Sequence, residues 1–157
     1  MNNSNQFVSL ERIESLKAGL LGAFAGTIAY SIAVIIDRWT IARLELPFSW
    51  TTASESLLNL VLATIVAGAS GFLFGVTYRY VIRRDRNPHL NSGAVLAFGL
   101  VRGLAQVNGT LDIAFEGLGS LLALAIVVFE SVLLFAVAAL ILDGAMERGW
   151  LKPFESE

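Results

Sequence analysis

Long apolar segments separated by short polar ones make up most of the chain. Four apolar segments cover residues 16–36, 55–82, 90–107 and 118–142, and each is long enough to cross about 30 Å of hydrocarbon. Backbone N–H and C=O groups inside lipid must pair within their own segment, so each segment is predicted to be an α-helix. The pattern therefore predicts an all-α polytopic membrane protein with four transmembrane helices.

Polar residues delimit one transmembrane domain, residues 16–142. Residues 1–15 place most of their apolar side chains on one helical face, which predicts a cytoplasmic amphipathic helix on the membrane surface. The alternative is that they form the first turns of the first spanning helix. Residues 143–157 are predicted to be a cytoplasmic tail, with Gly144 ending the fourth helix because glycine readily adopts the left-handed conformation of a helix cap.

Two pairs of segments resemble each other along the chain. AGLLGAF (18–24) is similar to SGAVLAF (92–98), and ESLLNLVLATIV (55–66) is similar to EGLGSLLALAIV (116–127). The second alignment also places Phe74 opposite Phe135. These similarities favour two tandem helical hairpins related by an axis along the membrane normal. Chance similarity between apolar segments is the alternative.

The composition supports a membrane class and limits the chemistry. The chain is 55% hydrophobic and 15% charged, whereas soluble domains carry about 25% charged residues. A net charge of −2 gives no basic field for a nucleic-acid partner. With no cysteine, no Ser–His–Asp set and no HExxH or Walker motif, the sequence favours a protein that is not an enzyme and requires no metal or cofactor. An enzyme acting on a lipid-soluble substrate is the least favoured class.

The distribution of basic residues predicts the orientation. With four crossings, both termini and the second loop share one side, and the positive-inside rule places that side in the cytoplasm. Most of the 11 Lys and Arg residues fall on that side: Arg12, Lys17, Arg79, Arg83, Arg84, Arg86, Arg148 and Lys152.

Small residues spaced four apart mark one face of three of the predicted helices. This spacing lets two helix backbones approach closely. It predicts packing within the bundle, with homodimerisation or docking to a partner as the alternative. The glycines concerned are Gly22, Gly26, Gly71, Gly75, Gly99 and Gly103.

Two ionisable residues, Arg102 and Glu130, lie inside apolar segments. Each costs about 2.5–3.5 kcal/mol at the bilayer centre on insertion scales, so each is expected to have a partner. One interpretation is a polar clamp between the third and fourth helices, with Asn59 or Gln106 taking part. The other makes Glu130 a proton or cation site, or a contact to a pigment or a partner subunit.

The depth of these residues decides how they pair. If the third helix ends at Val107, Arg102 lies about 8 Å from the outer helix end and Glu130 about 18 Å from it. This favours outward pairing of Arg102 with Asp112 or Glu116. A third helix that continues towards residue 115 would instead let Arg102 meet Glu130.

Two further features indicate ligands. Arg79, Arg83, Arg84 and Arg86 form a basic loop that would attract anionic lipid headgroups or an acidic partner, or that serves only as the topology signal. His89 is the single histidine, and it is a candidate axial ligand for haem or chlorophyll or an ordinary interfacial residue.

Residues 9–26, SLERIESLKAGLLGAFAG, resemble small four-helix integral membrane proteins of cyanobacteria and plastids. The resemblance implies a thylakoid or bacterial plasma membrane, with photosynthetic or respiratory complexes as partners, but no site residues. The sequence thus favours a non-catalytic accessory or assembly subunit surrounded by lipid and other membrane subunits. The alternative is a small oligomeric transporter or channel that uses Glu130 and Arg102.

Overall fold

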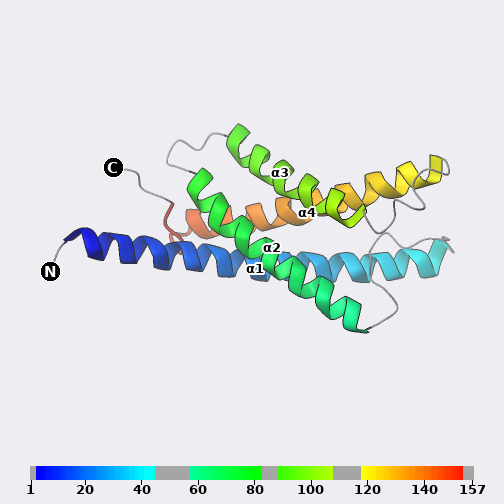
Figure 1. Cartoon of the computed structure of the whole chain (residues 1–157), viewed down its shortest axis with the longest axis horizontal. Coiled ribbons are helices and arrows are strands. Elements are labelled where there is room, and N and C mark those ends of the chain that lie inside the picture. The colour runs from blue at the N-terminus through cyan, green and yellow to red at the C-terminus, as the bar shows by residue number, and fades with distance from the viewer. Residues whose placement is uncertain (1–2, 45–56, 83–87, 108–117, 154–157) are drawn as a thin grey trace.

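In the part of the chain that the structure describes, the protein is a bundle of four antiparallel helices. The computed structural model describes residues 3–44, 57–82, 88–107 and 118–153. Each helix runs back along the one before it, so that both chain ends lie at one end of the bundle, called here the terminal end (Figure 1). The all-α class is confirmed for the described residues. The helices are α1 Asn3–Leu44, α2 Leu57–Val81, α3 Pro88–Val107 and α4 Leu118–Glu147.

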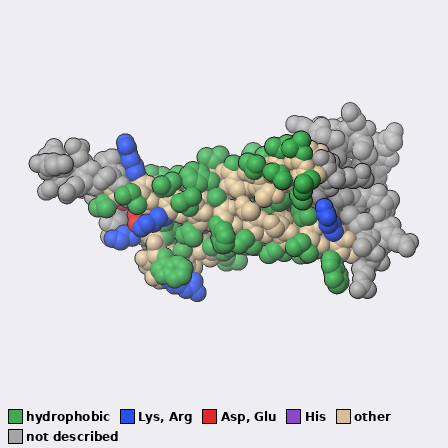
Figure 2. Space-filling model, turned by 90° about the horizontal axis from the view of Figure 1, so that it is seen from below, with side chains coloured by type: hydrophobic (Ala, Val, Ile, Leu, Met, Phe, Trp, Pro, Cys, Tyr) green, Lys and Arg blue, Asp and Glu red, His purple; other side chains and the backbone are tan. Residues whose placement is uncertain are grey.

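Three of the helices are long and apolar enough to cross a membrane. These segments are Leu10–Ile36 of α1, Leu57–Val81 of α2 and Leu124–Glu147 of α4. The more polar α3 is not among them. On the face drawn in Figure 2, hydrophobic side chains cover the middle of the bundle and most Lys and Arg side chains gather at the terminal end. These are the features of a membrane protein.

The helix ends differ from the predicted ones at both chain ends. α1 is one continuous helix, so residues 3–15 are part of the same helix as the first span. α4 continues through Gly144 to Glu147, because its apolar face stays buried at Leu142 and Ala145. The expectation that Gly144 ends α4 is wrong.

Gly149 ends the last helix instead. It has a φ of 72°, the left-handed conformation that glycine adopts without steric cost. Its N–H donates to the carbonyl of Met146 at 3.1 Å, and the N–H of Trp150 donates to that of Ala145 at 2.9 Å. This pattern closes the last turn of α4 and directs the chain back over the bundle.

In the first hairpin, α1 and α2 pack backbone against backbone. A Cβ atom added at Gly22 would collide with the carbonyl oxygen of Gly71, and one added at Gly26 would lie 2.9 Å from the carbonyl oxygen of Ala67. A Cβ atom added at Gly75 would likewise collide with the carbonyl oxygen of Ala18. Only residues without a large side chain permit this approach.

In the second hairpin, glycines of α3 face valines of α4. A Cβ atom at Gly99 would lie 2.6 Å from the Cα of Val132, and one at Gly103 would lie 2.7 Å from the Cα of Val128. The close approach here depends on glycine in only one of the two helices.

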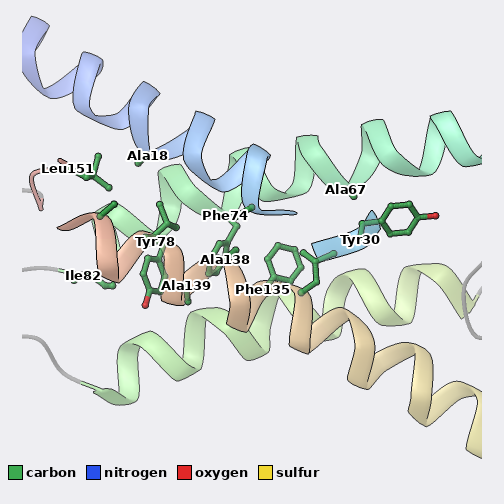
Figure 3. Close-up of a cluster of buried hydrophobic side chains, with 14 of the residues drawn as sticks. Ala18, Tyr30, Ala67, Phe74, Tyr78, Ile82, Phe135, Ala138, Ala139 and Leu151 are labelled. Atoms are coloured by element: carbon green, nitrogen blue, oxygen red, sulfur yellow. The ribbon is translucent and has the colours of Figure 1, made fainter. Parts of the chain in front are cut away.

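An aromatic cluster joins the two hairpins. The ring of Phe74 on α2 lies 5.0 Å from that of Phe135 on α4 and 5.4 Å from that of Phe98 on α3, between ring centroids. Phe74 and Phe135 are completely buried. Figure 3 shows both within the core, together with Tyr78 and Ala138. The centre of the bundle is therefore formed by residues of both hairpins.

Candidate functional site

Four polar residues, one from each helix, form a polar junction inside the bundle: Tyr30, Ser70, Arg102 and Glu130. The Nη1 of Arg102 donates a hydrogen bond to the Oγ of Ser70 at 3.2 Å. The guanidinium also lies within electrostatic range of the Glu130 carboxyl and the Tyr30 hydroxyl. Tyr30 is buried, and the other three side chains are partly covered. The junction therefore links all four helices around one positive charge.

The packing of α3 on α4 explains why Arg102 and Glu130 lie at a similar level of the bundle. α3 ends at Val107, yet α4 begins well beyond that level and projects past α3 at the end opposite the terminal end (Figure 1). Because Gly103 packs on Val128, Arg102 lies near the level of Glu130. The expectation that Glu130 lies deeper than Arg102 assumed that the end of α3 and the start of α4 lie at the same level, which is wrong. Asp112 and Glu116 lie outside the described residues, so their pairing with Arg102 stays a prediction.

The other polar residues expected in the clamp lie away from its centre. Asn59 is exposed near the start of α2, about three turns before Ser70. Gln106 is half-buried on α3, about one turn beyond Arg102. Ser70 was not singled out from the sequence. Its position between Ala67 and Gly71, on the small-residue side of α2, was the signal that it faces another helix.

A cavity of about 120 Å³ lies beside the polar junction, between α1 and α4. Its walls are apolar and include Ala29 and Ala33 of α1 and Leu133 and Leu134 of α4. Among the described residues, Glu130 is the one ionisable residue that lines it. Glu130 therefore belongs to the polar junction and also lines an apolar cavity.

Arg79 occupies a second polar cluster, at the terminal end. Its side chain is completely buried. Its Nη2 lies 2.6 Å from Oε2 of Glu11, its Nη1 donates to the Oγ of Ser15 at 2.7 Å, and its Nε donates to the carbonyl of Lys152 at 2.9 Å.

This burial corrects the interpretation of Arg79 as a lipid-binding residue of the basic loop. α2 continues to Val81, so Arg79 belongs to a helix and faces α1 rather than the headgroup region. The remaining residues of that loop, Arg83, Arg84 and Arg86, lie outside the described residues.

His89 lies exposed on the first turn of α3. Within the part of the chain that the structure describes, no group of three or more His, Cys, Asp or Glu residues is placed to hold a metal ion. A role of His89 as a haem or chlorophyll ligand stays a prediction.

The fold defines a class, an α-helical bundle with three helices able to cross a membrane. Comparison with protein-family models, with curated proteins and with solved structures gives no match. The resemblance of residues 9–26 to small membrane proteins of cyanobacteria and plastids therefore stays a prediction.

Proposed function

We propose that this chain is an integral membrane protein with four crossings that acts as a non-catalytic accessory or assembly subunit of a larger membrane complex. The polar junction carries this proposal. Its four residues come from four helices and lie close together around Arg102, whose Nη1 donates to the Oγ of Ser70. Polar groups arranged in this way fix the register of helices in lipid.

A fourth crossing by α3 is supported by its length and its neighbours. Twenty residues span about 30 Å as a helix, which matches the hydrocarbon thickness. α3 lies alongside α4 within the bundle (Figure 1). Its one charged side chain, Arg102, is directed towards Ser70 on α2 rather than left to face lipid. Arg102, which lowers the hydropathy of α3, thus has a hydrogen-bond partner within the bundle.

Cytoplasmic termini are supported by the charges of the described residues. Exposed Arg12, Lys17, Arg148 and Lys152 lie at the terminal end, and exposed Arg38 lies towards the opposite end of α1. The positive-inside rule favours the more basic side as cytoplasmic.

An origin of the bundle in two tandem hairpins is supported by the aromatic cluster. Phe74 and Phe135 are equivalent positions in the alignment of the second segment pair, and their rings lie 5.0 Å apart. Equivalent residues of two repeats meet in this way when they lie next to the axis that relates the repeats.

The exterior of the bundle supports a partner within the membrane. Large apolar side chains are exposed along α1, α2 and α3, and the polar parts of the chain are short. Other membrane subunits and lipid are therefore the surfaces that this protein meets. The resemblance of residues 9–26 favours a photosynthetic or respiratory complex in a thylakoid or bacterial plasma membrane.

The native mass of the tagged full-length chain, extracted in mild detergent, tests the proposal. We expect a large particle in which mass spectrometry identifies subunits of a membrane complex. A colourless monomer or small homo-oligomer would contradict it. An absorbance spectrum of the same particle shows whether it contains chlorophyll or haem, and His89→Ala then tests whether His89 is a ligand.

A small transporter or channel is the second candidate, favoured by one observation: Glu130 borders both the polar junction and the apolar cavity. Glu130→Gln separates the two candidates. In an accessory subunit it lowers stability or assembly and changes no flux. In a transporter it abolishes proton-linked flux in proteoliposomes while the protein still accumulates. Glu147→Gln, at an exposed carboxylate of the terminal end, is the matched control.

A further inference from the structure

The last described residues of the chain, 149–153, form a strap that folds back onto the bundle. Gly149 makes the turn, and Leu151 then places its side chain in the core, where it is 1% exposed. Figure 3 shows Leu151 on the side of the core that faces α1 near Ala18. The neighbouring Trp150 is 71% exposed. The strap is thus anchored by one apolar side chain and leaves its neighbour outside.

Arg79 connects this strap to the N-terminal part of α1. Its Nε donates to the strap carbonyl of Lys152 at 2.9 Å, while its Nη atoms contact Glu11 and Ser15 on α1 at 2.6 and 2.7 Å. One buried guanidinium therefore has partners near both ends of the chain. Removing one partner of a buried charged group is costly, because the group left behind loses a hydrogen bond without regaining water.

A second, weaker contact joins the same two parts of the chain. The backbone N–H of Lys152 donates to the Oε2 of Glu14 at 3.2 Å, and Glu14 is also paired with Lys17 at 2.7 Å. This contact is exposed to solvent, so it contributes less than the buried one.

We propose that the strap and Arg79 form a latch, in which closure of the strap and burial of the Arg79 guanidinium are one event. Opening of the strap breaks the hydrogen bond between the Arg79 Nε and the Lys152 carbonyl and exposes the guanidinium to solvent. Its contacts with Glu11 and Ser15 are then weakened. A displaced α1 does the same to the strap from the other side. Because such coupling is reciprocal, a partner that binds the strap at the terminal end changes the position of α1. This inference goes beyond the proposed function and does not depend on it.

Cysteine labelling tests the latch directly, because the chain contains no cysteine. Leu151→Cys reports strap opening, and Trp150→Cys is the exposed control in the same strap. In the closed protein, a maleimide should label Leu151→Cys at least about tenfold more slowly than Trp150→Cys, since labelling requires local opening. Equal rates at the two positions would overturn the proposal.

Variants of Arg79 then test the coupling. Adding Arg79→Met to Leu151→Cys should raise the labelling rate towards that of Trp150→Cys, and Arg79→Lys should raise it less. Arg148→Met, at an exposed arginine directly after α4 that donates only to the carbonyl of Gly144 among the described contacts, should leave the rate unchanged. Unchanged protection of Leu151→Cys in the Arg79 variants would contradict the latch.

The reverse direction keeps the proposal testable if the Arg79 variants do not accumulate. Removal of residues 150–157 deletes most of the strap and leaves Arg79 in place. It should raise the labelling rate of Ser15→Cys, a buried position beside Arg79, but not that of exposed Lys17→Cys. A Ser15→Cys position that stays protected without the strap would overturn the proposal.

Discussion

The two hairpins share a topology but pack by different means. α1 and α2 present small residues to each other, so two backbones meet at Gly22, Gly71 and Gly75. α3 presents glycines to valines, at Gly99 against Val132. At Gly22 and Gly75 the added Cβ would meet only main-chain atoms of the facing helix, whereas at Gly99 it would meet both the Cα and the side chain of Val132. Equivalent helix pairs can thus reach close contact with glycine on both sides or on one.

If the hairpins are the proposed tandem repeats, the packing indicates which of their residues correspond. In the α2–α4 alignment Val132 corresponds to Gly71, and these residues do face matching glycines, Gly99 and Gly22. The similarity of AGLLGAF to SGAVLAF instead pairs Gly22 with Leu96. The packing instead pairs Gly22 with Gly99, three residues further along α3, which shifts this part of the alignment by about one helical turn.

The largest expected effect is at the centre that both hairpins share. Phe74→Ala and Phe135→Ala each remove a completely buried ring and should each lower the free energy of unfolding by about 3–5 kcal/mol. The measurement is unfolding in mixed detergent micelles. Phe129→Ala, at an exposed position of α4, is the control. A loss at Phe129 as large as that at Phe135 would show that the cluster is not the shared core.

A smaller loss is expected from Gly22→Ala in the first hairpin. The added Cβ meets backbone atoms of α2, so the helices must separate, at a cost of about 1–3 kcal/mol. Gly93→Ala on α3 is the matched control, because nothing lies within 4 Å of the added atom. If the two variants unfold at the same detergent concentration, α1 and α2 are not in backbone contact.

Rescue distinguishes the two interfaces. Gly99→Ala should destabilise the second hairpin, and Val132→Ala should restore only part of the loss, about 1 kcal/mol, in the double variant, because it removes the Cγ2 at 2.7 Å from the added Cβ but leaves the Val132 Cα at 2.6 Å. No equivalent rescue exists for Gly22→Ala, because Gly71 has no side chain to shorten. Strictly additive effects of Gly99→Ala and Val132→Ala in a double-mutant cycle would contradict this difference.

The smallest effect is expected at the hydrogen bond that ties the hairpins together. Ser70→Ala removes the acceptor for Arg102 and should cost about 0.6 kcal/mol and at most about 1.7 kcal/mol, the range for hydrogen bonds between membrane helices. Ser31→Ala, which removes only an exposed bond to the carbonyl of Thr27 within α1, is the control. Equal stability of the two variants would mean that the junction contributes nothing through Ser70.

Sequence patterns predicted the elements well because hydrophobic length and small-residue spacing are local properties. The four helices and the facing glycines follow from such patterns. The end of α4 could not be predicted in this way. Gly144 and Gly149 are both glycines after an apolar segment, and which of them ends the helix depends on the burial of Leu142 and Ala145 by other helices.

The sites were harder to predict because they depend on packing between helices. Arg79 stands next to a run of basic residues, yet its environment is set by Glu11 and Lys152, which lie far from it in the sequence. The level of Arg102 relative to Glu130 depends on which residue of α4 faces Gly103. No spacing within a single segment contains that information.

The length of α1 has a mechanical consequence. It continues as one helix over 42 residues, about 63 Å at 1.5 Å per residue, whereas its membrane-crossing segment is Leu10–Ile36. Proline, the commonest cause of a sharp kink, is absent from it. α1 therefore extends beyond both ends of the segment able to cross a membrane, and a displacement of its first residues, 3–9, would be transmitted through one continuous helix to Trp39 near its other end.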